Sequence, residues 1–214
     1  MSTFASDYVG ERSTAAILGQ VMFLVAVALG FAVAGTFMGR DLNEGTAQVC
    51  TFAGLGMLIV TWFVDAVRRG PLGIGWLCGL SLLIGLGLGP VIGYLTEVDP
   101  GAITSAAGIT ALTVVAMGAL GFVLDKDLSG WMKPLSYVVL GAVVISLGAL
   151  IFGGLGTLSP VISLIILVAS ALLILVDFNY VRKHATEDDV VWLATGIFVS
   201  ILNIFLSLLN LTSD

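Results

Sequence analysis

Almost the whole chain lies in long apolar stretches, and this pattern constrains the fold more than any other feature. A helix needs about 20 mostly apolar residues to cross a bilayer. Seven stretches meet that length: 15–38, 49–67, 72–95, 102–124, 134–152, 161–181 and 190–211. Backbone polar groups in lipid must bond within the chain, and these runs are too long and uniformly apolar for barrel strands. We therefore predict an all-α membrane protein with a single seven-helix transmembrane domain over residues 15–211.

The composition agrees with burial in a lipid bilayer. Only 10% of the residues are charged, against about 25% in soluble domains. Eight Lys and Arg residues within a net charge of −6 argue against nucleic acid as a partner. Residues 1–14 form a polar tail without the basic start of a cleaved signal peptide, so we expect the first apolar stretch to remain as a span.

The basic residues predict the orientation. With the N-terminus in the cytoplasm and seven spans, the cytoplasmic side holds seven Lys and Arg residues, and the other side holds only Arg40. The seven are Arg12, Arg68, Arg69, Lys126, Lys133, Arg182 and Lys183. This asymmetry follows the positive-inside rule and places the C-terminus on the opposite side of the membrane.

Small residues four apart predict close helix packing, because they let helix backbones approach each other. The third span carries this spacing at Gly85, Gly89 and Gly93. The first span carries it at Ala26, Gly30 and Ala34. Pro90 is expected to kink the third span, either as a hinge or pore-lining bend or simply within a tightly packed helix.

Three carboxylates lie near the predicted cytoplasmic ends of spans: Asp65, Asp125 and Asp177. An ionisable residue within a span is a functional hypothesis by default. Asp65 precedes Arg68 and Arg69 by three and four residues, which is the spacing of a helical ion pair. Asp125 is interpreted as part of a solvated helix end.

Asp177 has no basic residue three or four positions away, and Arg182, a possible counter-ion, is five away. Ser163, Ser170 and Asp177 recur every seven residues and so share one helix face. The seventh span has a similar small and polar face, formed by Gly196, Ser200, Asn203 and Ser207. Two readings stay open for these faces: a structural hydrogen-bond network, or part of a cation or proton path.

Two opposing effects act on the protonation state of Asp177. Desolvation favours the protonated acid, whereas nearby basic charges favour the anion. A group of this kind could titrate near working pH and switch a local contact. The following "TEDD" places Thr186 three residues before Asp189, and this spacing predicts an N-cap for the last span.

The chain lacks the residues that several classes of membrane protein require. A retinal protein needs a lysine within its last span, but Lys126, Lys133 and Lys183 lie in loops or at span ends. A zinc protease needs a pair of histidines, and the chain has one, His184, in a loop. No P-loop or dinucleotide fingerprint is present. We therefore expect neither an enzyme nor a cofactor.

The order of motifs resembles the Bax inhibitor-1 family over residues 15–211. The motifs are "LGPVIGYL" closing the third span, "DKDLSGW" after the fourth and "FVSILNIFLSLL" in the seventh. The resemblance implies a compact seven-helix bundle. The last motif is most similar to the bacterial YccA-type branch, which implies a bacterial inner-membrane protein.

The resemblance implies a pH-sensitive calcium leak for some family members, sensed by a pair of aspartates. The first aspartate matches Asp177, which could then bind Ca²⁺ transiently or exchange H⁺. The second position is Ser200, which cannot share a proton as a carboxylate does. Asp65 is a possible substitute, with Arg68 or Arg69 as its counter-ion.

The YccA-type branch implies a different role, in which the protein binds and modulates the membrane protease FtsH and its partners. A polar N-terminal tail, which the protease could grip, would suit that role. Our first expectation is therefore a pH-responsive calcium or cation leak with Asp177 as the titrating gate residue. The alternative is a membrane-embedded regulator acting by protein contact on FtsH-type proteolysis.

Overall fold

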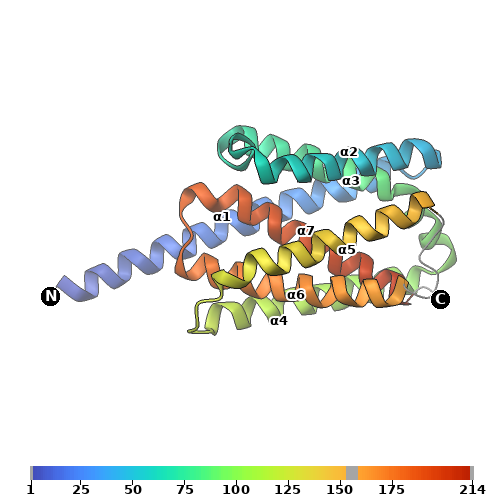
Figure 1. Cartoon of the computed structure of the whole chain (residues 1–214). Coiled ribbons are helices and arrows are strands. Elements are labelled where there is room, and N and C mark those ends of the chain that lie inside the picture. Colours follow the sequence, from blue (N-terminus) through green and yellow to red (C-terminus); the bar gives the residue numbers. More distant parts are fainter. Residues whose placement is uncertain (1, 153–158, 213–214) are drawn as a thin grey trace. The chain divides into compact units, whose positions relative to one another are not determined.

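The computed structural model describes residues 2–152 and 159–212, with side chains at residues 14–146 and 159–212. This part of the chain forms seven long helices and no strand, which confirms the predicted fold class. Each helix contains a segment long and apolar enough to cross a membrane. The helices are α1 (Ser2–Met38), α2 (Glu44–Phe63), α3 (Gly70–Val98), α4 (Pro100–Val123), α5 (Met132–Phe152), α6 (Ser159–Lys183) and α7 (Val190–Thr212) (Figure 1).

Several helix ends differ from the predicted spans, and two of them, in α1 and α2, affect how the sequence is interpreted. α1 begins at Ser2, so the polar residues ahead of the first span continue the same helix. α2 ends at Phe63, four residues before the predicted end of the second span, because Val64 is extended, with φ −117° and ψ 103°. A separate 3₁₀ turn, η1, follows at Asp65–Arg68. Gly70 then adopts a φ of +60°, which favours glycine, as α3 begins.

Side chains of the expected type cap several helix starts. The Asn43 side chain accepts a hydrogen bond from Thr46 N at 2.9 Å at the start of α2. The 3₁₀ turn η4 (Glu187–Asp189), which leads into α7, confirms the cap predicted from "TEDD". There the Asp189 carboxylate accepts from both the backbone N–H and the hydroxyl of Thr186, at 2.9 and 2.7 Å.

The chain divides into two compact units: Met1–Val98 with His184–Phe198, and Asp99–Lys183 with Val199–Asp214. In the first unit, α3 packs against α1 and against α2. Gly85 and Gly89 lie at the α1 contact, where an added Cβ would collide with the backbone of Ala32 and Gly39 respectively. Gly93 lies nearer the end, 3.6 Å from the Arg40 side chain by the same measure. α3 continues as a helix on both sides of Pro90.

The predicted packing face of α1 is wrong. Ala26, Gly30 and Ala34 are exposed, and nothing lies within 4 Å of a Cβ built on Gly30. The small residues that meet α3 are Ala32, Gly35 and Gly39. Both sets have helical spacing, and the partner helix decides which of them is used.

In the second unit, α6 packs against α4 and against α5. On the α5 side, Ala169 and Leu173 bury against Val139. On the α4 side, two glycines allow a closer approach. A Cβ on Gly118 would lie 3.1 Å from the Phe178 ring, and one on Gly121 would collide with the carbonyl of Leu175. This close contact brings the polar end of α6 to the end of α4.

Candidate functional site

Asp177 lies within α6, and its residue surface is only 5% exposed. Among the residues that the structure describes, no side chain or backbone group hydrogen-bonds to its carboxyl or pairs with it. Buried ionisable groups in membrane helices generally have a partner, so this one is exceptional. The sequence prediction located this residue, and the structure supplies its surroundings.

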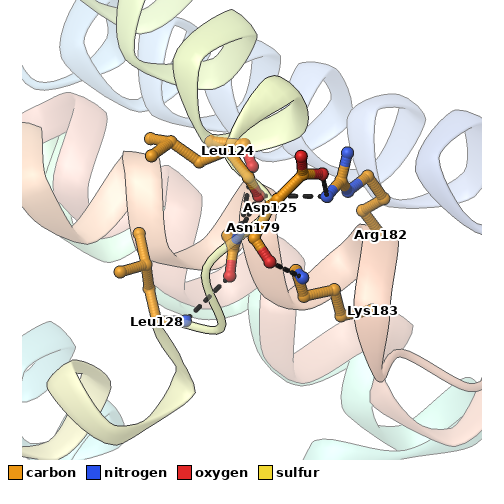
Figure 2. Close-up of polar contacts among 7 residues, drawn as sticks. Leu124, Asp125, Leu128, Asn179, Arg182 and Lys183 are labelled. Atoms are coloured by element: carbon orange, nitrogen blue, oxygen red, sulfur yellow. Dashed lines mark hydrogen bonds and ion pairs between the residues drawn. The ribbon is translucent and has the colours of Figure 1, made fainter.

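Arg182 is not the counter-ion of Asp177. Its Nη2 donates to Asp125 Oδ1 at 3.2 Å and to the carbonyl of Leu124 at 3.0 Å (Figure 2). The adjacent Lys183 donates from Nζ to the backbone carbonyl of Asp125. The two basic residues in the last turn of α6 therefore both bind the segment that follows α4. The prediction failed because it considered partners on the same helix, whereas Asp125 is 57 residues away in sequence.

Asn179, which the sequence analysis did not select, lies at the centre of this contact. It is fully buried, and its Nδ2 donates to the carbonyls of Gly121 and Leu124 at 3.1 and 3.0 Å. Its Oδ1 accepts from Leu128 N at 2.9 Å (Figure 2). These bonds satisfy backbone groups that the end of a helix leaves without partners. The available signal was an amide inside an apolar span, two residues beyond Asp177.

Asn179 and Asp177 serve different sides of α6. Two residues correspond to a rotation of about 200° around a helix, so the two side chains point in nearly opposite directions. Asn179 faces α4, since it bonds to Gly121 and Leu124. Asp177 therefore points away from the contact that occupies Arg182 and Lys183.

Asp65 is an exposed residue of the first unit. It lies in η1, beyond the end of α2, and its side chain is 82% exposed. Arg68 Nη1 pairs with it at 3.3 Å, as the spacing predicted, and Arg68 Nε also donates to the carbonyl of Thr61 at 2.7 Å. Arg69 pairs instead with Asp188, at 3.6 Å. The prediction that Asp65 lies inside the second span is wrong, and a solvated carboxylate is a poor substitute for a buried one.

The polar face of α6 and the C-terminal half of α7 meet within the second unit. The hydroxyls of Ser159 and Ser163 donate to Asn210 Oδ1 at 3.2 and 3.0 Å. Ser200 is buried on α7, as is Ser207, while Asn203 is half-buried. The predicted stripe does not extend to Gly196, which is exposed.

The arrangement has limited capacity for a metal ion. In the described part of the chain, no three His, Cys, Asp or Glu residues lie close enough together to hold one. A transient Ca²⁺ at Asp177 therefore stays a prediction that depends on a single carboxyl. What the site combines is a buried acid on one side of α6 and a dense hydrogen-bond network on the other.

Comparison with known proteins extends this description. A family model described as "Inhibitor of apoptosis-promoting Bax1" matches residues 14–214. The Pseudomonas aeruginosa protein PA2604, described as uncharacterized, is 29% identical over 210 residues, covering 94% of this chain and 90% of the relative. The Escherichia coli K12 protein named "Modulator of FtsH protease YccA" is 29% identical over 210 residues, covering 96% of this chain and 93% of the relative. An Escherichia coli O6:H1 relative with the same identity and coverage is named "Inner membrane protein YccA".

These findings agree with the structure. The described residues form seven helices of membrane-spanning length, and one relative is named an inner membrane protein, which confirms the predicted location in a bacterial inner membrane. The family match begins where the apolar part of α1 begins, at Thr14, and continues through α7. This chain therefore belongs to the Bax inhibitor-1 family of integral membrane proteins.

Proposed function

We propose that this protein regulates other membrane proteins by direct contact, and that its partner is an FtsH-type membrane protease. The observation that carries the proposal is the 29% identity to the Escherichia coli protein named as a modulator of that protease, which extends over 96% of this chain. The likeness covers the whole bundle, so it is not confined to one shared motif.

The start of α1 suits a role in protein contact. The helix begins at Ser2, while its apolar segment begins at Thr14. Twelve residues of helix, about 18 Å in length, therefore precede the span. Their sequence, "STFASDYVGERS", is largely polar, and we propose it as the segment that the protease engages.

We also propose that the protein acts without catalysing a reaction. The charged residues at the ends of α6 and α4 hold the fold together, since Arg182 and Lys183 bond to Asp125. At the α2–α3 turn, Arg68 and Arg69 pair with Asp65 and Asp188. Charged side chains that are held in ion pairs and hydrogen bonds of this kind can fix the shape of a surface that a partner protein contacts.

Reconstitution tests this proposal. The full chain is placed in proteoliposomes with an FtsH-type protease, and the rate at which the protease degrades a membrane-protein substrate is measured. We expect the full chain to slow degradation, and a variant lacking residues 2–13 to have a much smaller effect, because the contacting helix is gone. A degradation rate unaffected by the full chain at any ratio to the protease would refute the proposal.

A second candidate is a pH-responsive cation leak with Asp177 as the titrating residue. The observation that favours it is the buried carboxyl without a partner among the described residues. A proton gained or lost there changes the charge inside the second unit. Arg182 and Lys183 are not available to offset that charge, because they bond to the segment that follows α4. Ser200 at the second family position argues that any gating here operates with one carboxyl.

Calcium flux into liposomes across a pH series tests the leak. Asp177→Asn should abolish the pH dependence, whereas Asp65→Asn should leave it intact, because the Asp65 side chain is solvated and paired with Arg68. Absence of flux at every pH would discard the leak and leave the regulator. Flux that persists unchanged in Asp177→Asn would keep the leak and discard this residue as its sensor.

A further inference from the structure

Ser170 differs from several other hydroxyl residues that are buried in these helices. Ser81, Thr110 and Thr195 each donate to the carbonyl four residues earlier, at 2.7–2.8 Å, so their own helix satisfies them. Ser170, near the middle of α6, is fully buried, and its Oγ has no hydrogen-bond partner in the described part of the chain. An orphaned polar group in a membrane interior is costly and requires an explanation.

The register of α6 and α7 places an amide at the same depth. These helices are antiparallel, because a short turn joins them, and Ser163 Oγ bonds to Asn210 Oδ1 at 3.0 Å. Seven residues along α6 from Ser163 is Ser170, and seven residues back along α7 from Asn210 is Asn203. Both steps cover about 10 Å and almost two full turns, so each residue stays on the face that forms the Ser163–Asn210 contact.

Asn203 also lacks a partner. It is half-buried, and no described group hydrogen-bonds to its carboxamide, which has two donor hydrogens and an acceptor oxygen. Two polar side chains therefore stand at one level of the second unit, each with unused hydrogen-bonding capacity. Both are neutral, so the chemistry that they offer suits a small neutral molecule able to donate and to accept.

We propose that Ser170 and Asn203 form a site that binds water in the membrane interior, between α6 and the C-terminal half of α7. A water molecule there accepts or donates at Ser170 Oγ and bonds to the Asn203 carboxamide, which satisfies both. Buried waters in proteins typically make two to four such bonds to groups that would otherwise lack partners. The site depends on neither function proposed above, since it involves neither Asp177 nor the start of α1.

The chain offers a matched control position. Ala169 is adjacent in sequence, lies at nearly the same depth and is also buried, at 5% exposure. It faces a different environment, because it packs with Val139 and Leu173 in the apolar contact between α6 and α5. A probe at residue 169 therefore reports burial alone, whereas a probe at residue 170 reports burial beside the proposed water.

Infrared spectroscopy of an introduced thiol tests the site, because the S–H group exchanges its hydrogen only where water reaches it. Ser170→Cys and Ala169→Cys are each made in a chain carrying Cys50→Ala and Cys78→Ala, and are transferred to D₂O. The thiol introduced by Ser170→Cys should convert from S–H to S–D at least about tenfold faster than that of Ala169→Cys, because exchange requires contact with solvent. Its stretching frequency should also be lower, because it donates a hydrogen bond.

Equally slow exchange at both positions would overturn the proposal, because it would leave Ser170 dry. A double-mutant cycle provides a second measurement, which introduces no thiol. The unfolding midpoints of Ser170→Ala, Asn203→Leu and the double variant should be non-additive if a water couples the two side chains. Additive shifts would mean that the serine is satisfied locally, for example by the carbonyl of Ile166, and would also overturn the site.

Discussion

The carboxamide of Asn179 donates to the carbonyl of Leu124, at 3.0 Å, so that a side chain of α6 closes the end of α4. The same side chain accepts from Leu128 N and thereby fixes the segment between α4 and α5. Gly121 makes this possible, because a side chain there would collide with the backbone of α6. One buried amide thus determines how two spans and their connecting segment fit together.

Asn179→Leu should therefore destabilise the second unit. The substitution keeps the volume but leaves the carbonyl of Gly121 and the N–H of Leu128 without these partners. We expect a loss of about 2 kcal/mol in the free energy of unfolding. Thermal unfolding in detergent measures it. Asn210→Leu is the comparison, since that amide is exposed and should cost clearly less; equal losses would contradict the account.

The glycines of α3 and α1 should respond in opposite ways to a methyl group. Gly85→Ala inserts an atom against the backbone of Ala32, and overpacking of this kind costs about 1–3 kcal/mol. Gly30→Ala meets open space and removes a poor helix former, so it should be neutral or slightly stabilising. Unfolding midpoints of the two variants decide the matter. A harmless Gly85→Ala would mean that α1 and α3 are not in close backbone contact.

Arg182 makes two kinds of contact, an exposed ion pair with Asp125 and a hydrogen bond to the carbonyl of Leu124 at the end of α4. Two substitutions distinguish their contributions to stability. Asp125→Asn removes only the charge of a fully exposed side chain, and exposed ion pairs of this kind contribute little to stability. Arg182→Met also removes the bond to the carbonyl of Leu124, so we expect the larger loss of stability from it. Titration with salt is the check, because only the ion-pair contribution should fade as ionic strength rises.

Ser200→Asp tests the position at which the resemblance to the family implies a second aspartate. Counting from the Ser163–Asn210 contact, Ser200 lies about one helical turn from the level of Asp177. If the leak operates in this family by two acids, the substitution should increase calcium flux in liposomes and strengthen its pH dependence. Ser200→Asn controls for polarity without charge. Identical flux in both variants would exclude a paired-carboxylate role for this position.

Much of the fold could be predicted, because membrane spans are identified by their length and apolar character alone. The seven helices and the cap at Thr186 required only local patterns. The packing face of α1 could not be read in this way, since Ala26 and Gly30 have the same helical spacing as Gly35 and Gly39. Only the partner helix distinguishes them.

The candidate site was predictable in part for a similar reason. Asp177 was found because a carboxylate inside an apolar run is rare and recognisable. Its supposed counter-ion was wrong, because Arg182 pairs across 57 residues with Asp125, and no spacing rule on a single helix contains that contact. Asn179 was missed because an amide carries no charge to draw attention, although burial makes its hydrogen bonds decisive.

The central claim is that this protein acts on an FtsH-type protease by contact, and one measurement tests it most directly. That measurement is the rate of substrate degradation in proteoliposomes containing the protease and increasing amounts of the Asp177→Asn variant. Contact through the start of α1 does not require this carboxyl, so degradation should slow as much as it does with the unaltered chain. A rate that the unaltered chain slows but Asp177→Asn does not would contradict the claim, because it would tie the effect on the protease to Asp177.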